Sequence, residues 1–274
     1  ETAQEESACA AEILDQLGKL AYRRPLTNDD TSLLTDFYLD GHAQGGFERG
    51  IQIALRFLLT SPEFLFRSEP DPENVDPGEV YTLDELALAS RMAFFLWSSI
   101  PDEELIDVAA AGQLSDQAIF DAQVERMLRD SRASTLVDNF AAQWLFLRNL
   151  QSSYPDTRTF PNFDNKLRDA FRTETEMFVT EVFRNDHSVL DLLTADWTYV
   201  NDRLADHYGI PNIYGSHFRK VEQVDDERRG LLGHGSILTV TSYPNRTSPV
   251  LRGKWVMENV IGSPAPPPPP NVPD

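Results

Sequence analysis

Apolar residues recur at intervals of three and four along almost the whole chain from Ser7 onward, and this spacing constrains the fold more than any other feature. It is the pattern of helices that bury one face. Prolines and N-capping residues divide it into segments, and no alternating, strand-like run is longer than a few residues. The sequence therefore predicts an all-α fold: a multi-helix array with an irregular C-terminal segment and a polyproline tail.

Capping residues and prolines set the ends of the predicted helices. Thr27 with Asp30, and Thr82 with Glu85, have capping-box spacing, while Ser248 before a proline is typical of a helix start. We expect a helix that opens at residue 27 and further helices over residues 7–24, 47–59, 83–97, 115–129, 133–147, 164–184, 188–193, 201–207 and 248–260. Residues 215–224 are interpreted as a short hairpin.

Stretches without apolar periodicity divide the chain into domains. Residues 69–80 are rich in proline and acid and are predicted to link an N-terminal helical domain, residues 1–68, to a central helical domain, residues 81–211. Residues 212–262 form a third segment, and residues 263–274 form a proline-rich tail. In that tail the run from Pro264 to Pro270 is expected to be a stiff polyproline II spacer.

The charge balance excludes some partners. The chain carries 44 acidic and 24 basic side chains, which gives a formal net charge of -20. Such a surface repels nucleic-acid phosphates and anionic lipid headgroups, so no nucleic-acid partner is expected. The most apolar stretch, residues 86–100, is shorter than the roughly 20 apolar residues of a membrane-spanning helix and contains an arginine. We expect no transmembrane segment.

That arginine, Arg91, stands nearly alone among apolar residues in a helix predicted to be buried. A buried guanidinium needs a carboxylate or an anionic ligand, because an uncompensated buried charge costs several kcal/mol. In the predicted helix 164–184, Glu174 falls inside the apolar stripe and Glu181 lies at its edge. The two helices either enclose a charged pocket or share a structural ion pair between Arg91 and Glu174, and we favour the ion pair.

Metal and nucleophile motifs are sparse. The histidines are His42, His187, His207, His217 and His234, and no two have the spacing that places two ligands on one helical face, so no metal site is predicted. Phosphate-binding loops and the nucleophile elbow of hydrolases are missing from the sequence. Cys9 is the single cysteine, and no histidine near it in sequence would activate it. Burial, or pairing with a cysteine outside these residues, is favoured over a catalytic thiol.

Residues 228–257 invert the charge pattern. They include Arg246, Arg252 and Lys254, as well as two arginines at their start, but no aspartate or glutamate. A segment of this length would carry about five acids at the chain's average frequency. Arginines can bind an anion bidentately, and the candidates are haem propionates, a sulfated or carboxylated glycan, and an acidic face of the same protein.

Several motifs in order resemble those of planctomycete-type secreted proteins. LGKLAYRRPLT with LTSPEFLFR is similar to one planctomycete-specific domain, and LASRMAFFLWSSIPDEEL, FAAQWLFLRNL and WTYVNDRLADHYGI are similar to the next. RGLLGHGSILTVTSYPNRTSPVLRGKWVMENVIG resembles the start of a planctomycete cytochrome-c domain. The resemblance implies that residues 212–262 begin such a domain without its haem-attachment motif.

The resemblance also implies a cofactor, a partner and a location. No cofactor is expected within these residues, but haem c is expected in the adjoining sequence, in a neighbouring cytochrome-c module of the same protein or complex. Such proteins are periplasmic, extracellular or on the cell surface, where Cys9 could form a disulfide with sequence outside this chain. His234 or Met257 would then be a distal iron ligand, and Arg246, Arg252 or Lys254 would neutralise haem propionates.

Three functions remain open. The leading one is a helical accessory part of an exported c-type cytochrome protein, in electron transfer or in an oxidative reaction. The second is a scaffold without catalysis, or a module that binds an anionic polysaccharide through the basic segment. The third is a hydrolase that uses Glu174, Asp196 or another carboxylate, which would require paired carboxylates in one cleft.

Overall fold

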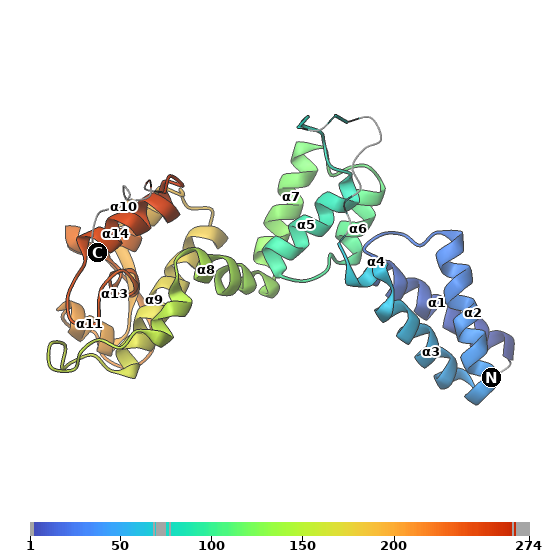
Figure 1. The fold of residues 1–274 in the computed structure, drawn as a ribbon, viewed down its shortest axis with the longest axis horizontal. Helices are drawn as coiled ribbons and strands as arrows, with labels where there is room; N and C mark the ends of the chain where they lie inside the picture. The colour runs from blue at the N-terminus through green and yellow to red at the C-terminus, as the bar shows by residue number, and fades with distance from the viewer. Residues whose placement is uncertain (1–2, 68, 70–74, 77, 265, 267–274) are drawn as a thin grey trace, which may run out of the picture. The chain divides into compact units, whose positions relative to one another are not determined.

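The computed structural model describes residues 3–67, 69, 75–76, 78–264 and 266. The chain divides into two compact units, Glu1–Ala133 and Ser134–Asp274 (Figure 1). Both are built mainly of helices, and the one sheet among the described residues is a pair of short strands. The predicted helical class is confirmed, with one small antiparallel ribbon added to it.

The first unit begins with three helices that pack on one another. Its elements are α1 (Ala3–Tyr22), α2 (Asn28–Gly45), α3 (Phe47–Thr60), α4 (Pro62–Leu65), α5 (Glu85–Trp97), α6 (Glu103–Ala110), α7 (Gln117–Arg129) and the 3-10 turn η1 (Ser131–Ala133). Leu14, Leu34 and Leu58 meet in the core of the first three helices. The capping box predicted at α2 is confirmed, since the side chains of Thr27 and Asp30 each accept a hydrogen bond from the other's backbone N–H.

Arg23 fastens α4 to the end of α1. Its backbone is left-handed, with φ 58°, and its side chain is buried. The guanidinium donates hydrogen bonds to the carbonyl oxygens of Ala21 at 3.1 Å, Glu63 at 2.6 Å and Phe66 at 2.9 Å. Carbonyl groups at helix ends lack partners within the helix, and a charged donor satisfies them.

The start of α5 differs from the prediction. Asp84, and not Thr82, is the N-cap, because its carboxylate accepts the backbone N–H groups of Leu86 and Ala87 at 3.0 and 3.2 Å. Glu85 therefore does not form the expected capping box with Thr82. Its carboxylate accepts the backbone N–H groups of Leu114 and Ser115, which ties α5 to the loop before α7.

Arg91 is not buried, and the predicted ion pair with Glu174 is wrong. The Arg91 side chain is 58% exposed, and its Nε donates to Oε1 of Glu69 at 2.7 Å. Glu174 has other hydrogen-bond partners, described below. The prediction failed because an apolar sequence does not show which helix face is covered: Phe95, four residues further on, is itself 53% exposed.

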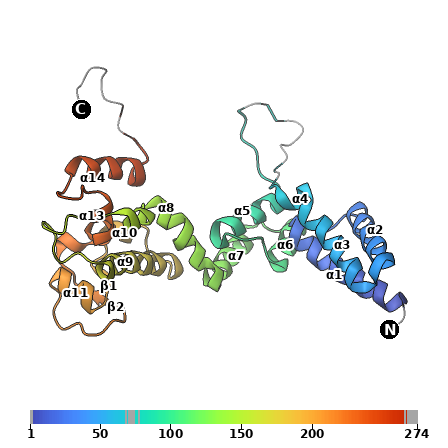
Figure 2. The ribbon, with the colours of Figure 1, turned by 60° about the horizontal axis from the view of Figure 1, so that its bottom comes forward.

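The second unit is arranged around α9. Its elements are the π-helical turn η2 (Leu136–Ala141), α8 (Ala142–Trp144), the 3-10 helix η3 (Leu147–Ser152), α9 (Asn165–Arg184), α10 (Asp191–Thr194), β1 (Trp197–Val200), α11 (Asp202–Tyr208), β2 (Arg219–Glu222), the 3-10 turn η4 (Asp226–Arg228), α12 (Gly230–Gly233), α13 (Gly235–Val240), α14 (Pro249–Trp255) and the π-helical turn η5 (Val256–Val260). Helix α9 contacts β1, α10, α11 and α13 (Figures 1 and 2).

The hairpin predicted within residues 215–224 is wrong. Strand β2 instead pairs antiparallel with β1, so that Trp197 lies opposite Glu222 and Val200 opposite Arg219. Helix α11 occupies the connection between the two strands. The ribbon thereby holds α11 against α9, and Val200 and Leu204 share a core with Phe171 of α9.

Two predicted helices are interrupted by turns that are not α-helical. The segment expected over 133–147 is split into η1, η2 and α8, and it ends at Phe146 with a left-handed φ of 60°. The segment 248–260 starts as predicted, with Ser248 accepting the N–H of Leu251, but continues as η5 after Trp255. The indole of Trp144 donates a 2.6 Å hydrogen bond to the carbonyl oxygen of Asn259, which joins the two regions.

Some predictions lie wholly or partly beyond the part of the chain that the structure describes. Of the predicted linker 69–80, only residues 69, 75–76 and 78–80 are described, and of the proline-rich tail only residues 263, 264 and 266. The polyproline II spacer thus stays a prediction. Over the described residues, no helix combines the length and apolar character that crossing a membrane requires.

Candidate functional site

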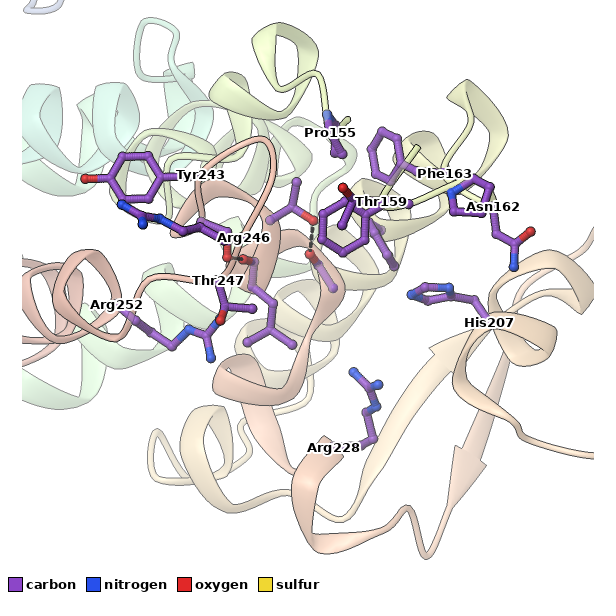
Figure 3. A pocket seen from close by; sticks show the side chains of 17 residues that line it. Pro155, Thr159, Asn162, Phe163, His207, Arg228, Tyr243, Arg246, Thr247 and Arg252 are labelled. Atoms are coloured by element: carbon purple, nitrogen blue, oxygen red, sulfur yellow. Dashed lines mark hydrogen bonds between the residues drawn. The ribbon is translucent and has the colours of Figure 1, made fainter. Parts of the chain in front are cut away.

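A pocket of about 500 Å³ opens in the second unit (Figure 3). One wall is the loop 155–163, which precedes α9, and the other is the segment from η4 to α14. Its lining residues are Pro155, Thr159, Phe160, Pro161, Asn162, Phe163, Phe171, His207, Arg228, Gly235, Leu238, Thr239, Ser242, Tyr243, Arg246, Thr247 and Arg252. The lining contains three arginines and no carboxylate. Its volume suits a small organic molecule.

Hydrogen bonds hold the loop wall in place. The N–H of Asp156 donates to the carbonyl oxygen of Pro244 at 2.8 Å, which joins the loop to the opposite wall. Arg203 donates to the carbonyl oxygen of Asn162. At the end of the loop, the ring of Phe163 lies 6.3 Å from that of Phe171, between ring centroids. The aromatic side of the pocket is therefore fixed at both ends.

A tight turn after α13 presents Arg246. Tyr243 and Arg246 pair through their backbones, with the N–H of Tyr243 donating to the carbonyl oxygen of Arg246 at 3.0 Å. The guanidinium of Arg246 then lies 5.1 Å from the centre of the Tyr243 ring. Arg252 follows one helical turn into α14, whose start is fixed by the Ser248 cap. Figure 3 shows Arg246 and Arg252 on the same side of the pocket.

Arg228 stands apart from these two arginines and is held by Tyr208. Its guanidinium lies 4.2 Å from the centre of the Tyr208 ring, and it donates to the carbonyl oxygen of Gly233 at 3.1 Å. Cation–π stacking and a single carbonyl leave other N–H groups of the guanidinium available to a ligand.

Gly235 lies where the pocket lining meets α9. A Cβ atom at this position would lie 2.1 Å from a carbon atom of the Phe171 ring, which is far inside van der Waals contact. Any residue with a side chain would displace the ring. Glycine therefore lets α13 approach α9 closely enough to form this part of the pocket.

The three pocket arginines lack carboxylate partners. Among the described residues, no carboxylate lies within 4.0 Å of the guanidinium nitrogens of Arg228, Arg246 or Arg252. The Nε atom of Arg252 is buried without a hydrogen-bond partner in the same part of the chain. Unpaired guanidinium groups in one pocket repel one another and present planar donors that match carboxylate or phosphate oxygens. The arrangement can bind an anion.

His207 faces the pocket opposite Arg246 and Arg252 (Figure 3). Desolvation by its surroundings lowers the pKa of the imidazole, and the nearby charges of Arg228 and Arg203 lower it further. Since the usual pKa of histidine is about 6.5, the ring is largely neutral at pH 7. It can donate or accept a hydrogen bond from a bound molecule.

A buried polar network lies behind the pocket. Glu174 is 1% exposed and accepts hydrogen bonds from the hydroxyl groups of Tyr208 at 2.6 Å and Thr198 at 2.7 Å. Burial raises the pKa of Glu174 to about 7, although both hydrogen bonds and the charge of Arg228 act against this. The hydroxyl of Tyr208 also accepts the backbone N–H of Gly235 at 2.7 Å.

His234 belongs to the same interior. It is 1% exposed; its Nδ1 lies 3.0 Å from the Thr175 hydroxyl, and its Nε2 lies 3.5 Å from the Thr198 hydroxyl. Burial lowers the pKa of its imidazole to about 3, so the ring is neutral. An iron ligand must be reachable from the haem, and His234 is enclosed on all sides. It does not fit the predicted role of a distal ligand.

Of the other residues expected to meet a haem module, the structure brings together only some. Arg246 and Arg252 line the pocket. Lys254 lies outside it and faces Glu258 at 3.7 Å, while Met257 is half-buried in η5. Of the three residues predicted to neutralise haem propionates, the pocket thus brings together two, Arg246 and Arg252. No group of three or more potential metal-ligating side chains occurs within the described ranges.

Sequence reasoning missed half of the pocket. The sequence analysis singled out neither His207 nor the loop 155–163. The FPNF run at 160–163 is the one signal that could have been used, since two aromatic residues in a loop need a surface to cover.

Three family matches cover most of the sequence. Residues 9–69 match PSD5, a protein of unknown function (DUF1595); residues 83–210 match PSD4, a protein of unknown function (DUF1592); and residues 228–274 match PSCyt3, a protein of unknown function (DUF1588). These three segments match planctomycete-specific domain families. PSCyt3 is a planctomycete cytochrome domain family. No curated protein and no solved structure matches the chain.

The pocket is shared by two of these families. The PSD4 match supplies the loop 155–163, Phe171 and His207, whereas the PSCyt3 match supplies Arg228, Gly235 and everything that follows. All of these residues lie in one compact unit. Neither family segment contains the whole pocket, so the PSCyt3 segment completes a site that PSD4 begins.

Proposed function

We propose that the second unit binds an organic carboxylate and is a helical accessory part of an exported, periplasmic or cell-surface c-type cytochrome protein. The observation that carries the proposal is the set of three guanidinium groups, from Arg228, Arg246 and Arg252, that line one pocket without a carboxylate partner among the described residues. A carboxylate would receive two parallel hydrogen bonds from a single arginine.

The rest of the lining favours an anion that is attached to an apolar, flat body. Phe160, Phe163 and Phe171 form one side of the pocket, and aromatic rings bind other rings by stacking or edge contacts. Two sources can supply such a carboxylate: the propionate groups of haem on an adjoining cytochrome-c module, and a free aromatic acid. The chemistry at the arginines is the same for both.

The PSCyt3 match supports the cytochrome setting. Arginines beside haem propionates compensate the negative charge of the propionates, and this changes the reduction potential of the iron. An accessory unit with this role would serve electron transfer, or an oxidative reaction on a substrate held in the same pocket. Expression together with the proposed cytochrome-c module permits a direct test, since a propionate contact predicts that Arg252→Ala shifts the potential and Arg229→Ala does not.

The other functions have less support in the geometry. A carboxylate-dependent hydrolase needs two carboxyl groups in one cleft. Glu174 is buried, Asp196 is exposed, and neither lines the pocket. A second pocket is lined by Lys166, Arg203 and several aspartates. Because its side chains carry both charges, it favours neither an anion nor a cation.

Four probes test the binding and identify its source. Benzoate and terephthalate represent free acids, mesoporphyrin carries two propionates, and mesoporphyrin dimethyl ester has the same ring without charge. Binding to the purified chain is measured by calorimetry or porphyrin fluorescence. The double variant Arg246→Gln, Arg252→Gln is compared with Arg229→Gln, whose arginine pairs with Asp226 at 2.9 Å outside the pocket.

We expect at least one carboxylate probe to bind, about tenfold or more weakly in the double variant and unchanged in Arg229→Gln. Binding of mesoporphyrin but not of its ester or the small acids would assign the pocket to haem propionates. Binding of benzoate or terephthalate would assign it to free acids. The proposal fails if no carboxylate probe binds, or if the double variant binds as well as the wild type.

A further inference from the structure

Tyr208 connects the arginine pocket to the buried carboxyl group of Glu174. The ring of Tyr208 supports the guanidinium of Arg228 at 4.2 Å, and its hydroxyl donates to Glu174 at 2.6 Å. The same hydroxyl accepts the N–H of Gly235, a lining residue. One side chain therefore separates a ligand-accessible positive charge from a fully buried acid.

The surroundings of Glu174 contain few other charges. Thr198 of β1 and Tyr208 of α11 donate hydrogen bonds to its carboxyl group, and Nε2 of His234, at the junction of α12 and α13, lies 3.5 Å from the Thr198 hydroxyl. His234 is neutral because burial lowers its pKa to about 3, and burial raises the pKa of Tyr208 well above 10. Arg228 is thus the permanent charge that acts on Glu174.

We propose that binding of an anion in the pocket is coupled to uptake of protons from solvent, and that Glu174 is the group that takes them up. The proposal rests on the anion-binding function proposed above. The coupling follows from Arg228, which stabilises the ionised form of Glu174 while the pocket is empty. An anion beside Arg228 cancels part of that field, so the buried carboxylate loses a favourable interaction and gains a proton.

Glu174 is suited to this role at neutral pH. Because burial raises its pKa to about 7, the protonated and ionised forms coexist in the empty protein. Protonation is then accessible with a small change in free energy. A carboxyl group at its usual value of about 4.3 would stay ionised whether or not the pocket were filled.

The sign of the pH dependence is fixed by this coupling. Binding raises the pKa of Glu174, so the protonated protein binds the anion more tightly, and the dissociation constant rises as the pH increases through about 7. His207 contributes a dependence of the same sign, because its imidazolium form also attracts an anion. The pKa of His207 is lowered from 6.5, so the pH dependence that it contributes lies in a more acidic range than that of Glu174.

Terephthalate is the probe for this test, because both of its carboxyl groups are ionised above about pH 6. Calorimetry at about pH 7 in two buffers with different ionisation enthalpies reports the protons taken up per molecule bound. We expect uptake of a few tenths of a proton, and a several-fold rise in the dissociation constant between about pH 6 and pH 8.

Two variants distinguish proton uptake by Glu174 from proton uptake by His207. Glu174→Gln should abolish the uptake near pH 7 and flatten the dissociation constant across this range, because the amide mimics the protonated acid. His207→Gln should retain both. Infrared spectroscopy gives a readout without ligand, since a protonated buried carboxylic acid has its own carbonyl band, which should vanish in Glu174→Gln and persist to higher pH in Arg228→Gln.

The outcomes distinguish the two proposals. Terephthalate binding that depends on the arginines but is accompanied by no proton uptake would overturn the coupling. The anion-binding function would then still stand. Uptake that survives in Glu174→Gln and disappears in His207→Gln would assign the proton to His207 and also overturn it. If none of the carboxylate probes binds, the anion-binding function fails and the coupling with it.

Discussion

The hydroxyl group of Tyr208 donates a 2.6 Å hydrogen bond to a carboxyl group of Glu174 that is fully enclosed by protein. Two hydroxyl donors are too few to compensate an ionised carboxylate for the water it has lost, because full burial disfavours the charged form strongly. The pKa of Glu174 is raised to about 7, while that of the same group in the unfolded chain is near 4.5. Stability must therefore depend on pH through this residue.

Glu174→Gln should make the protein less sensitive to pH. Between about pH 4.5 and pH 7 the folded wild type binds more protons at Glu174 than the unfolded chain does, so its stability falls as the pH rises through this window. The loss amounts to about 3 kcal/mol for a shift of this size. Urea unfolding at several pH values should show the fall in the wild type and its absence in the variant.

Glu181→Gln is the matched control on the same helix. Desolvation acts on Glu181 too, but hydrogen bonds from Lys220 and Tyr199 outweigh it and lower the pKa. This variant should therefore lose stability at neutral pH relative to acid. If the two glutamine variants respond to pH alike, the assignment of the dependence to Glu174 is wrong.

Gly235→Ala should distort the pocket and destabilise the second unit by about 2–3 kcal/mol, as expected when a group is forced into a packed interior. The added methyl would lie 2.1 Å from the Phe171 ring. Gly253→Ala is the control, since nothing lies within 4 Å of its added methyl. Alanine in a helix should stabilise there by about 0.5–1 kcal/mol. Thermal unfolding of both variants measures the contrast.

Replacing each of two arginines of the first unit by alanine should change the stability by very different amounts. Arg23→Ala removes four hydrogen bonds from a buried guanidinium to carbonyl groups and should destabilise by about 2–4 kcal/mol. Arg91→Ala removes an exposed pair with Glu69 and should change the melting temperature little. A large loss in Arg91→Ala would mean that the outer face of α5 is covered in solution.

Cys9 should react readily with iodoacetamide in the isolated chain, because its side chain is exposed and it is the single cysteine. The resemblance to exported proteins predicts a disulfide with sequence outside these residues. In the protein purified from its native source, Cys9 should then resist alkylation until a reductant is added. Mass spectrometry of tryptic peptides with and without reductant distinguishes the two states.

Helix positions were largely predictable because capping and proline signals are local. Thr27, Asp164 and Ser248 cap helices where the sequence placed them. Glu85 shows the limit of such signals: its side chain reaches the backbone near Leu114, a contact that sequence spacing near residue 85 does not encode. The pairing of β2 with β1 is non-local in the same way.

The candidate site was predictable only in its basic half. The absence of acids from residues 228–257 pointed to Arg246 and Arg252, which do line the pocket. It also pointed to Lys254, which lies outside the pocket near Glu258, one residue past the acid-free segment. His207 comes from a different part of the chain, and its place opposite the arginines depends on how α11 packs against α9.

The absence of carboxylates from the pocket lining also determines what the pocket rejects. A zwitterion such as an amino acid brings an ammonium group together with its carboxylate, and the described lining has no negative side chain to compensate that group. The corresponding keto acid or hydroxy acid carries only the anion. The pocket should therefore bind a keto acid or hydroxy acid more tightly than the corresponding amino acid, because its described lining offers the ammonium group no carboxylate.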